Sequence, residues 1–118
     1  MAANSTYEFE VFMIATSTSA TPDIRVGINC PTGASIVWEL DNYPDASARY
    51  QSPSVNASGT YISGLTIDST GPTVIKIRGM VSLGATAGNL QVTWAQSTSN
   101  ATATKVLTNS FLKLGKLN

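Results

Sequence analysis

Three carboxylates that lie close together in the sequence, Glu39, Asp41 and Asp45, are the residues best suited to chemistry. Two acids held roughly 5–10 Å apart can hydrolyse a glycosidic bond. Together with the neighbouring Asn42, the same residues could instead supply oxygen ligands to calcium. Their spacing does not fit the D-x-D-x-D-G pattern of a calcium loop, and a solvated turn explains them without any ligand. The solvated turn is the preferred interpretation, with a metal site and a catalytic pair as the alternatives.

Two further residue types limit the chemistry. The chain contains no histidine, which removes the commonest general base, the usual metal ligand and every Ser-His-Asp or Cys-His arrangement. Cys30 is the single cysteine, so a disulfide within the chain is excluded. The sequence therefore predicts a protein without enzymatic activity, without a cofactor and without a bound metal.

Aromatic residues offer a different chemistry, the stacking of a sugar ring on an exposed side chain. Tyr43 and Tyr50 lie in the irregular stretch 41–58, which makes them candidates for exposed contacts. Trp38 and Trp94 belong to alternating segments, where we expect each to anchor the core of its strand. The predicted contacts with a ligand or with an assembly partner are Asn4, Asp41, Tyr43, Asp45 and Tyr50.

A single all-β domain is the fold that the composition predicts. The chain has 118 residues, of which 42% are apolar and only 12% are charged, and serine and threonine make up about a quarter of it. This length allows one core, and the abundance of Thr, Val and Ile favours strands. No apolar run approaches the roughly 20 residues of a membrane span, and the cations form no dense basic stripe for nucleic acid. We therefore expect neither membrane nor nucleic-acid partners.

Alternation of apolar and polar residues places the strands in the sequence. It predicts strands over residues 7–15, 23–29, 34–40 and 60–67, followed by three or four more between Thr73 and Leu117. Residues 41–58 show no sustained period. The pattern predicts a jelly-roll or β-sandwich of about eight antiparallel strands over residues 6–118, preceded by a short polar arm of residues 1–5. We expect the apolar C-terminal stretch to be a paired strand locked into the core.

The placement of charge has two interpretations, and the surplus of apolar surface points to contacts between copies of the chain. Every carboxylate precedes residue 69, and the later part of the chain carries only cations. Acidic early strands can pair with basic late strands within one sheet, or a dipolar subunit can meet its neighbours with opposite faces. The first strand is also apolar on both faces, and surplus apolar area on strands usually marks an oligomer contact. The predicted interface residues are Phe9, Val11, Phe12, Val37, Trp94 and Leu112.

The C-terminal region carries a recognisable pattern. Residues 88–117 read G-N-L-Q-V-T-W-A-Q-S-T-S-N-A-T-A-T-K-V-L-T-N-S-F-L-K-L-G-K-L. They resemble a pattern at the C-termini of many tailed-bacteriophage virion proteins, G-x-L-x-x-x-W/F-A-Q, then S-x-A-T-A-T-x-V, then G-S-x-L-x-x-x-K/R-L. The segments Y-E-F-E-V-F-M, P-D-I-R-V-G-I and C-P-T-G-A-S-I-V-W-E-L are similar to earlier strands of the same family. Asn109 stands where the pattern usually has glycine, but asparagine tolerates a left-handed backbone, so we expect the turn to be kept.

This resemblance implies a small jelly-roll of the tumour-necrosis-factor or C1q type, which usually forms a trimer around a threefold axis. Because only a few residues precede the first strand, we expect a free-standing module. The expected function is that of a homotrimeric capsid decoration (cement) protein, made in the host cytoplasm and bound to the major capsid protein of the virion. The alternative is a tail-fibre or tail-tip module that binds a receptor or a host-surface glycan.

Overall fold

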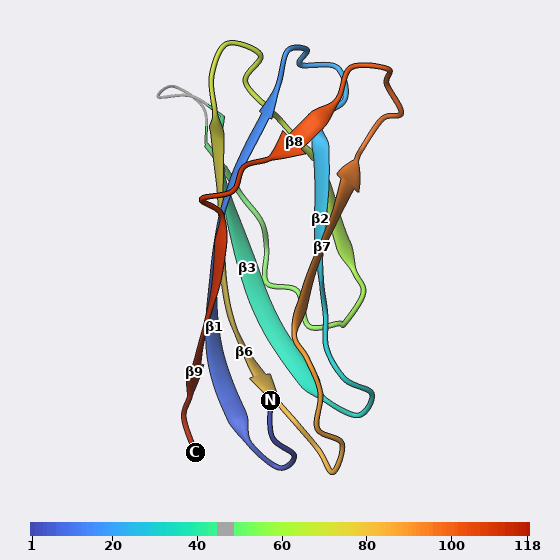
Figure 1. The fold of residues 1–118 in the computed structure, drawn as a ribbon. Coiled ribbons are helices and arrows are strands. Elements are labelled where there is room, and N and C mark those ends of the chain that lie inside the picture. Colours follow the sequence, from blue (N-terminus) through green and yellow to red (C-terminus); the bar gives the residue numbers. More distant parts are fainter. Residues whose placement is uncertain (45–48) are drawn as a thin grey trace.

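The protein folds into two antiparallel β-sheets that pack face to face, as the computed structural model shows for residues 1–44 and 49–118 (Figure 1). This arrangement confirms the predicted all-β sandwich. Asp45, one of the predicted contact residues, lies outside the described residues. In the described part of the chain, no helix has the length and apolar character needed to cross a membrane.

The larger sheet contains six strands. Its long middle strands pair in the order β3, β6, β1, while β4 extends the sheet beyond β3, and β8 and β9 pair with successive parts of the free side of β1. Their bounds are β1 Thr6–Ser17, β3 Ser35–Tyr43, β4 Tyr50–Gln51, β6 Thr73–Ser82, β8 Thr104–Val106 and β9 Phe111–Lys116.

Among the described residues, the smaller sheet has three strands, in the order β5, β2, β7. They span Tyr61–Leu65 for β5, Ile24–Asn29 for β2 and Gln91–Gln96 for β7. The pairing of β2 with β5 shifts register between Ile24 and Val26, and Gly64 lies opposite this shift with a φ of 70°. Glycine adopts a positive φ at no steric cost, which is why a bulge can form at this position.

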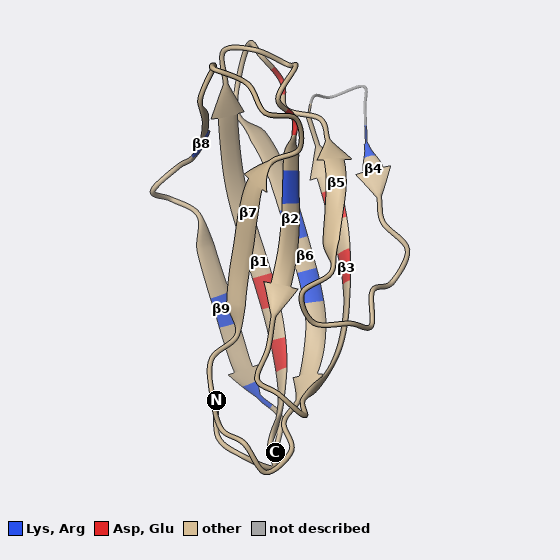
Figure 2. Cartoon of the chain, turned by 90° about the vertical axis from the view of Figure 1, so that its right-hand side faces the viewer, with Lys and Arg blue, Asp and Glu red and all other residues tan. Residues whose placement is uncertain are grey.

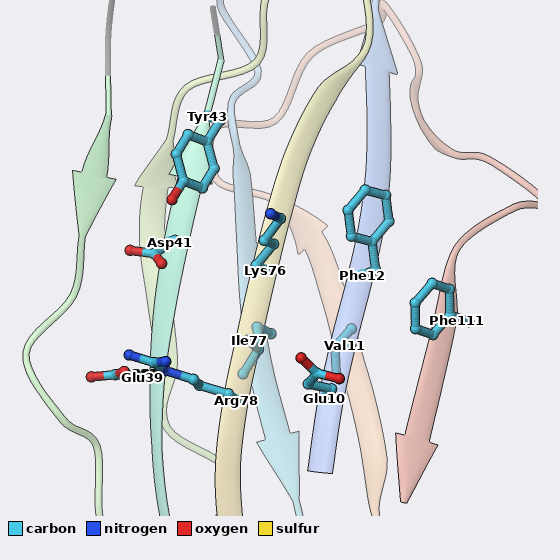
Figure 3. Close-up of a pocket in the computed structure, with 10 residues that line it drawn as sticks. All are labelled: Glu10, Val11, Phe12, Glu39, Asp41, Tyr43, Lys76, Ile77, Arg78 and Phe111. Atoms are coloured by element: carbon cyan, nitrogen blue, oxygen red, sulfur yellow. Dashed lines mark hydrogen bonds and ion pairs between the residues drawn. The ribbon is translucent and has the colours of Figure 1, made fainter.

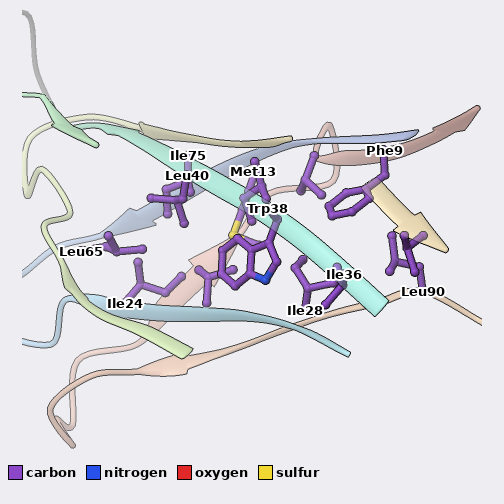
Figure 4. Close-up of a cluster of buried hydrophobic side chains, with 14 of the residues drawn as sticks. Phe9, Met13, Ile24, Ile28, Ile36, Trp38, Leu40, Leu65, Ile75 and Leu90 are labelled. Atoms are coloured by element: carbon purple, nitrogen blue, oxygen red, sulfur yellow. The ribbon is translucent and has the colours of Figure 1, made fainter. Parts of the chain in front are cut away.

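The core lies between the two sheets and follows the predicted alternation. Trp38 is 1% exposed and occupies its centre, surrounded by aliphatic side chains from both sheets (Figure 4). Phe9 and Val11, both predicted to contact another copy, are 2% and 5% exposed in this core. Their burial within the subunit leaves almost no side-chain area for a neighbour. The prediction placed them wrongly because a strand with apolar residues on both faces does not reveal which face is covered.

Residues 41–58, predicted to be irregular, extend the larger sheet in part. Asp41 and Tyr43 continue β3, and the two-residue strand β4 pairs with Asp41 and Asn42. Further along, Val55 forms a bridge with Trp38, with N–O distances of 2.7 and 2.9 Å in the two directions. Two residues are too short a segment for alternation to reveal, which explains why the sequence did not predict β4.

The predicted polar arm, residues 1–5, is attached to the fold. The amino group of Met1 donates a 2.6 Å hydrogen bond to the carbonyl oxygen of Gly88, and the Gly88 amide donates to the Met1 carbonyl. The amide of Asn4 donates to the Gly84 carbonyl at 2.8 Å. Asn4 is exposed with a φ of 52°, a conformation that asparagine tolerates better than most residues. These bonds bind the arm to the segment that precedes β7.

Asp23, which directly precedes β2, gives a pH-dependent prediction. Partial burial raises the pKa of its carboxyl group above the usual value, and a hydrogen bond from the Ile67 amide opposes this rise only in part. At a pH above both the raised pKa and the pKa in the unfolded chain, this carboxylate is ionised in the native state although it is poorly solvated there. This lowers the stability of the native state. Asp23→Asn should therefore raise the melting temperature at pH 7, and asparagine also suits the φ of 46° found there.

The raised pKa of Asp23 also determines how the stabilisation by Asp23→Asn depends on pH. As the pH falls through the raised pKa, the wild-type protein binds a proton more readily in its native state, so the stabilisation by Asp23→Asn should shrink and then level off below the unfolded pKa. Thermal unfolding of both proteins between pH 3 and pH 7 measures this change. A melting-temperature difference that stays constant across the range would contradict the assignment.

Candidate interaction surfaces

Opposite charges alternate across the outer face of the six-stranded sheet. The register places Glu39 beside Arg78, Arg78 beside Glu10, and Glu10 beside Lys113. One row further along, Asp41 lies beside Lys76. Acidic residues of early strands thus neighbour basic residues of late strands, which confirms the interpretation that the uneven charge distribution is matched within one sheet.

Two ion pairs form among the described residues, and both belong to this face. Arg78 donates a short hydrogen bond through Nε to Glu39 Oε1, and Arg49 Nη2 lies 3.3 Å from Asp41 Oδ1. The bond to Glu39 also raises the pKa of Arg78, so this guanidinium stays charged throughout the accessible pH range. Both pairs are open to solvent, where screening leaves ion pairs little net stabilising effect. They organise the surface rather than hold the fold together.

A groove of about 360 Å³ lies on this outer face, between β3, β6, β1 and β9 (Figure 3). Aromatic side chains from three strands line it: Tyr43 from β3, Phe12 from β1 and Phe111 from β9. The rings of Phe12 and Phe111 are stacked, with centroids 5.7 Å apart and planes inclined by 9°. Lys76 lies between the two aromatic ends, with Nζ 5.5 Å from the Tyr43 ring and 5.8 Å from the Phe12 ring.

The predicted acidic cluster lies in part along this groove. Glu39 and Asp41 project from the same face of β3, and each is paired with an arginine of the same subunit. Within residues 1–44 and 49–118, no group of three metal-ligating side chains comes together. Ordinary ion pairing thus accounts for the two carboxylates that the structure describes, which favours the solvated interpretation over a catalytic pair.

The two predicted stacking tyrosines do not form one surface. Tyr50 pairs with Asn42, whose side chain faces the core side of the sheet. Tyr43 is the next residue along β3 and therefore faces the opposite side, because side chains alternate along a strand. The groove instead combines Tyr43 with Phe12 and Phe111. Phe12 was predicted as an oligomer contact, and Phe111 was not singled out.

A second surface lies where the sandwich is open along one side. Leu112 and Leu114 of β9 lie opposite Val11 and Phe9 in register, so their side chains face the inner side of the larger sheet. They are nevertheless 41% and 40% exposed. Figure 2 shows why, since β9 lies beyond β7, the last strand of the smaller sheet. The prediction that this strand is paired is confirmed, but the prediction that it is locked into the core is wrong.

The β7 side of this opening is also apolar. Trp94 pairs with Val26 and faces inwards, yet it is 41% exposed because no strand follows β7 in the sheet order. The expectation that Trp94 anchors the core is therefore wrong. A cavity of about 220 Å³ separates the two strands. We call this surface the open edge, and its inner-facing apolar residues are Val92, Trp94, Val106, Leu112 and Leu114.

The six predicted interface residues are thus divided among three places. Phe9 and Val11 lie in the core, and Trp94 and Leu112 lie on the open edge. The remaining two, Phe12 and Val37, face outwards from the larger sheet, where Val37 is 53% exposed beside Met80. Leu114, Val92 and Val106 were not predicted, although the apolar residues on both faces of β9 were a signal in the sequence.

Comparisons with protein-family models, with curated proteins and with solved structures found no match to this chain. The class of protein is therefore defined by the structure alone. It is an all-β sandwich of two unequal antiparallel sheets, with a charged and aromatic groove on its outer face and an apolar open edge.

Proposed function

We propose that the protein is a non-enzymatic structural component of a phage virion that works as a homotrimer, most simply as a capsid decoration protein. The observation that supports self-assembly most directly is the open edge. Its inner-facing side chains Trp94, Leu112 and Leu114 are each about 40% exposed although they point toward the space between the sheets. Apolar patches of this kind mark interfaces. The sequence resemblance to virion proteins supports the location.

The proposal includes a jelly-roll topology of the trimer-forming type. Two features of the strand order support it. The first strand, β1, and the last, β9, are neighbours in the larger sheet. The chain also passes from one sheet to the other between β1, β2 and β3 and again between β5, β6 and β7. In such a subunit, the open edge is the side that would face the threefold axis.

The mechanism would be mechanical. A trimer that binds only the assembled lattice stabilises it by mass action, because every bound copy favours the state that carries its binding site. The outer face of the larger sheet and the described residues of the segment 41–58 remain available for the shell when the open edge is covered. They contain Asp41, Tyr43 and Tyr50, and Asn4 is exposed in the N-terminal segment, whose start lies at the opposite end of the subunit (Figure 1).

Two measurements test this proposal. Native mass spectrometry of the purified protein at micromolar concentration should give three times the mass of the 12.4 kDa chain. Virions stripped of the protein should then lose resistance to heat while they keep adsorption to the host, and intact particles should hold it in hundreds of copies. A monomer at every concentration would refute the trimer. Loss of adsorption with a handful of copies per particle would move the protein to the tail.

The outer groove favours a second candidate function, glycan binding. A groove of about 360 Å³ is within the range of small-ligand sites, and it combines aromatic rings with carboxylates and cations that can bond to sugar hydroxyls. If it binds a glycan, Tyr43→Ala and Phe111→Ala should each abolish a signal on a glycan array, whereas Val37→Ala, on the same face outside the groove, should keep it. No glycan signal for the wild-type protein would refute this candidate.

A further inference from the structure

The smaller sheet ends at an unprotected strand. β7 closes the order β5-β2-β7, and its sequence, Q-V-T-W-A-Q, contains neither a charge nor a proline. Edge strands that must not pair with other chains usually carry lysine, proline or a bulge. β7 pairs with β2 in unbroken register from Gln91 to Gln96 and shows none of these devices. Its free side therefore remains competent to accept another strand.

The smaller sheet lacks one strand beside β7. Figure 2 shows β9 of the larger sheet lying further to the side than β7, and among the described residues no strand of the smaller sheet lies opposite β9. A strand added to β7 would cover Leu112 and Leu114 and would also close the side of Trp94 that faces the cavity. Such a strand needs an apolar inner face with a polar or neutral outer one.

We propose that this strand is β9 of a neighbouring copy, which pairs with the free edge of β7 and completes the smaller sheet. This inference rests on the proposed self-assembly and identifies the surfaces that meet. β9 has the same length as β7, six residues in each case. It also presents Leu112 and Leu114 on one face, as the missing strand must. Each copy would give its β9 to one neighbour and receive β9 from another.

Strand direction and facing agree with this pairing. β7 and β9 run in opposite directions within one subunit (Figure 1). A symmetry axis parallel to the strands keeps these directions, so β9 of the neighbour would lie antiparallel to β7, the more favourable ladder. At the open edge, the larger sheet extends beyond the smaller one. Each copy can therefore fill the gap beside β7 of the next copy. A ring needs two different contact surfaces on each subunit, and the open edge provides both on one side.

The exposed apolar area of the open edge forms the centre of a contact with a second copy. Trp94, Leu112 and Leu114 are each about 40% exposed. Given full areas of roughly 150–250 Å² for large side chains, they present on the order of 200 Å². This area is the apolar middle of an interface that, at standard size, covers about 800 Å² per partner.

Cross-linking between differently tagged copies tests the contact. In a Cys30→Ser background, one copy carries Ala95→Cys on the outer face of β7 and the other carries Lys113→Cys on the outer face of β9. After the pair is mixed and reassembled, a bis-maleimide with a reach of about 10 Å should join the two tags, because adjacent strands lie about 4.8 Å apart. The control pairs Ala95→Cys with Met80→Cys, whose side chain is 51% exposed on β6, two strands away from β9 in the larger sheet, and should give no product.

Amide hydrogen exchange provides an independent measurement that needs no substitution. Amides on the free side of β7 should exchange rapidly in dilute monomer and become protected in the assembled protein. A trimer with no link between the tagged copies and no added protection of β7 would overturn this inference but leave the proposed function standing. A protein that never assembles would refute both.

Discussion

Replacing Gly79 with alanine is expected to destabilise the subunit by about 3 kcal/mol, the upper end of the usual cost of overpacking. Gly79 is paired with Phe9 on one side and with Trp38 on the other, so it occupies the centre of the core face of β6. A Cβ atom there would lie 2.4 Å from the carbonyl oxygen of Val37, 2.6 Å from Cζ of Phe9 and 2.7 Å from Cβ of Trp38. None of these is the flexible end of a long side chain, so the backbone itself must move.

Urea unfolding of the two proteins measures this loss through the shift of the midpoint. The matched control is Gly71→Ala in a surface turn, where the nearest atom to the new Cβ is Asp68 Oδ2 at 3.9 Å and φ is not positive. Gly71→Ala should leave the midpoint nearly unchanged or raise it slightly, because alanine reduces the freedom of the unfolded chain. Equal midpoints for Gly79→Ala and the wild type would show that the packing of Phe9 against Trp38 has been placed incorrectly.

The double substitution Leu112→Asp, Leu114→Asp is expected to dissociate the proposed trimer. Burial of the remaining 40% of each leucine stabilises the interface by about 0.6–1.2 kcal/mol, and a buried unpaired carboxylate in its place adds a larger cost. The dissociation constant should therefore rise by more than about 100-fold. Because both side chains are already about 40% exposed in the subunit, the circular dichroism spectrum of the folded chain should be retained. Analytical ultracentrifugation over a concentration series measures the constant.

A matched pair of substitutions separates this effect from a general loss of apolar surface. Val37 and Met80 are neighbours on the outer face of the larger sheet and are 53% and 51% exposed, more than the two leucines. Val37→Asp, Met80→Asp should therefore leave the mass of the assembly unchanged. If this control dissociates the protein while the leucine variant remains assembled, the outer face and not the open edge joins the copies.

Local alternation in the sequence was sufficient to predict most strands and the composition of the core. Trp38 falls on the buried side of β3 as predicted, together with Ile36, while Val37 and Glu39 fall on the other side. This works because the side-chain period of a strand is two, so a single correctly assigned residue fixes the facing of all the others. Gly64 was predictable for a similar local reason, since a glycine within a strand often marks a bulge.

How far each sheet extends beyond the other at the open edge was not predictable from the sequence. Leu112 and Trp94 both face inwards, and alternation alone assigns both to a core. Whether another strand covers them depends on how many strands each sheet contains, which is set by pairings between residues far apart in the chain. Phe9 and Val11 show the opposite error, because they were assigned to an interface although the smaller sheet covers them.

The outer groove depends on register in the same way. Phe12 and Phe111 are 99 positions apart in the sequence (111 minus 12) and stack only because β9 pairs with β1 in the observed register. A shift by one residue would move Phe111 to the inner side and Leu112 to the outer side. The placement of charge gave less information about the groove. It favoured acidic and basic strands within one sheet, but it did not predict the order of those strands.

The uncharged edge of β7 has a consequence for the handling of the isolated subunit. An edge without lysine or proline does not discriminate between partners, so copies that fail to close into a ring can add to one another without limit. Overproduction away from its assembly partners should then yield fibrillar or gelled material as the concentration rises. Thr93→Lys, in the middle of this strand, would be the first substitution to try for keeping a soluble stock.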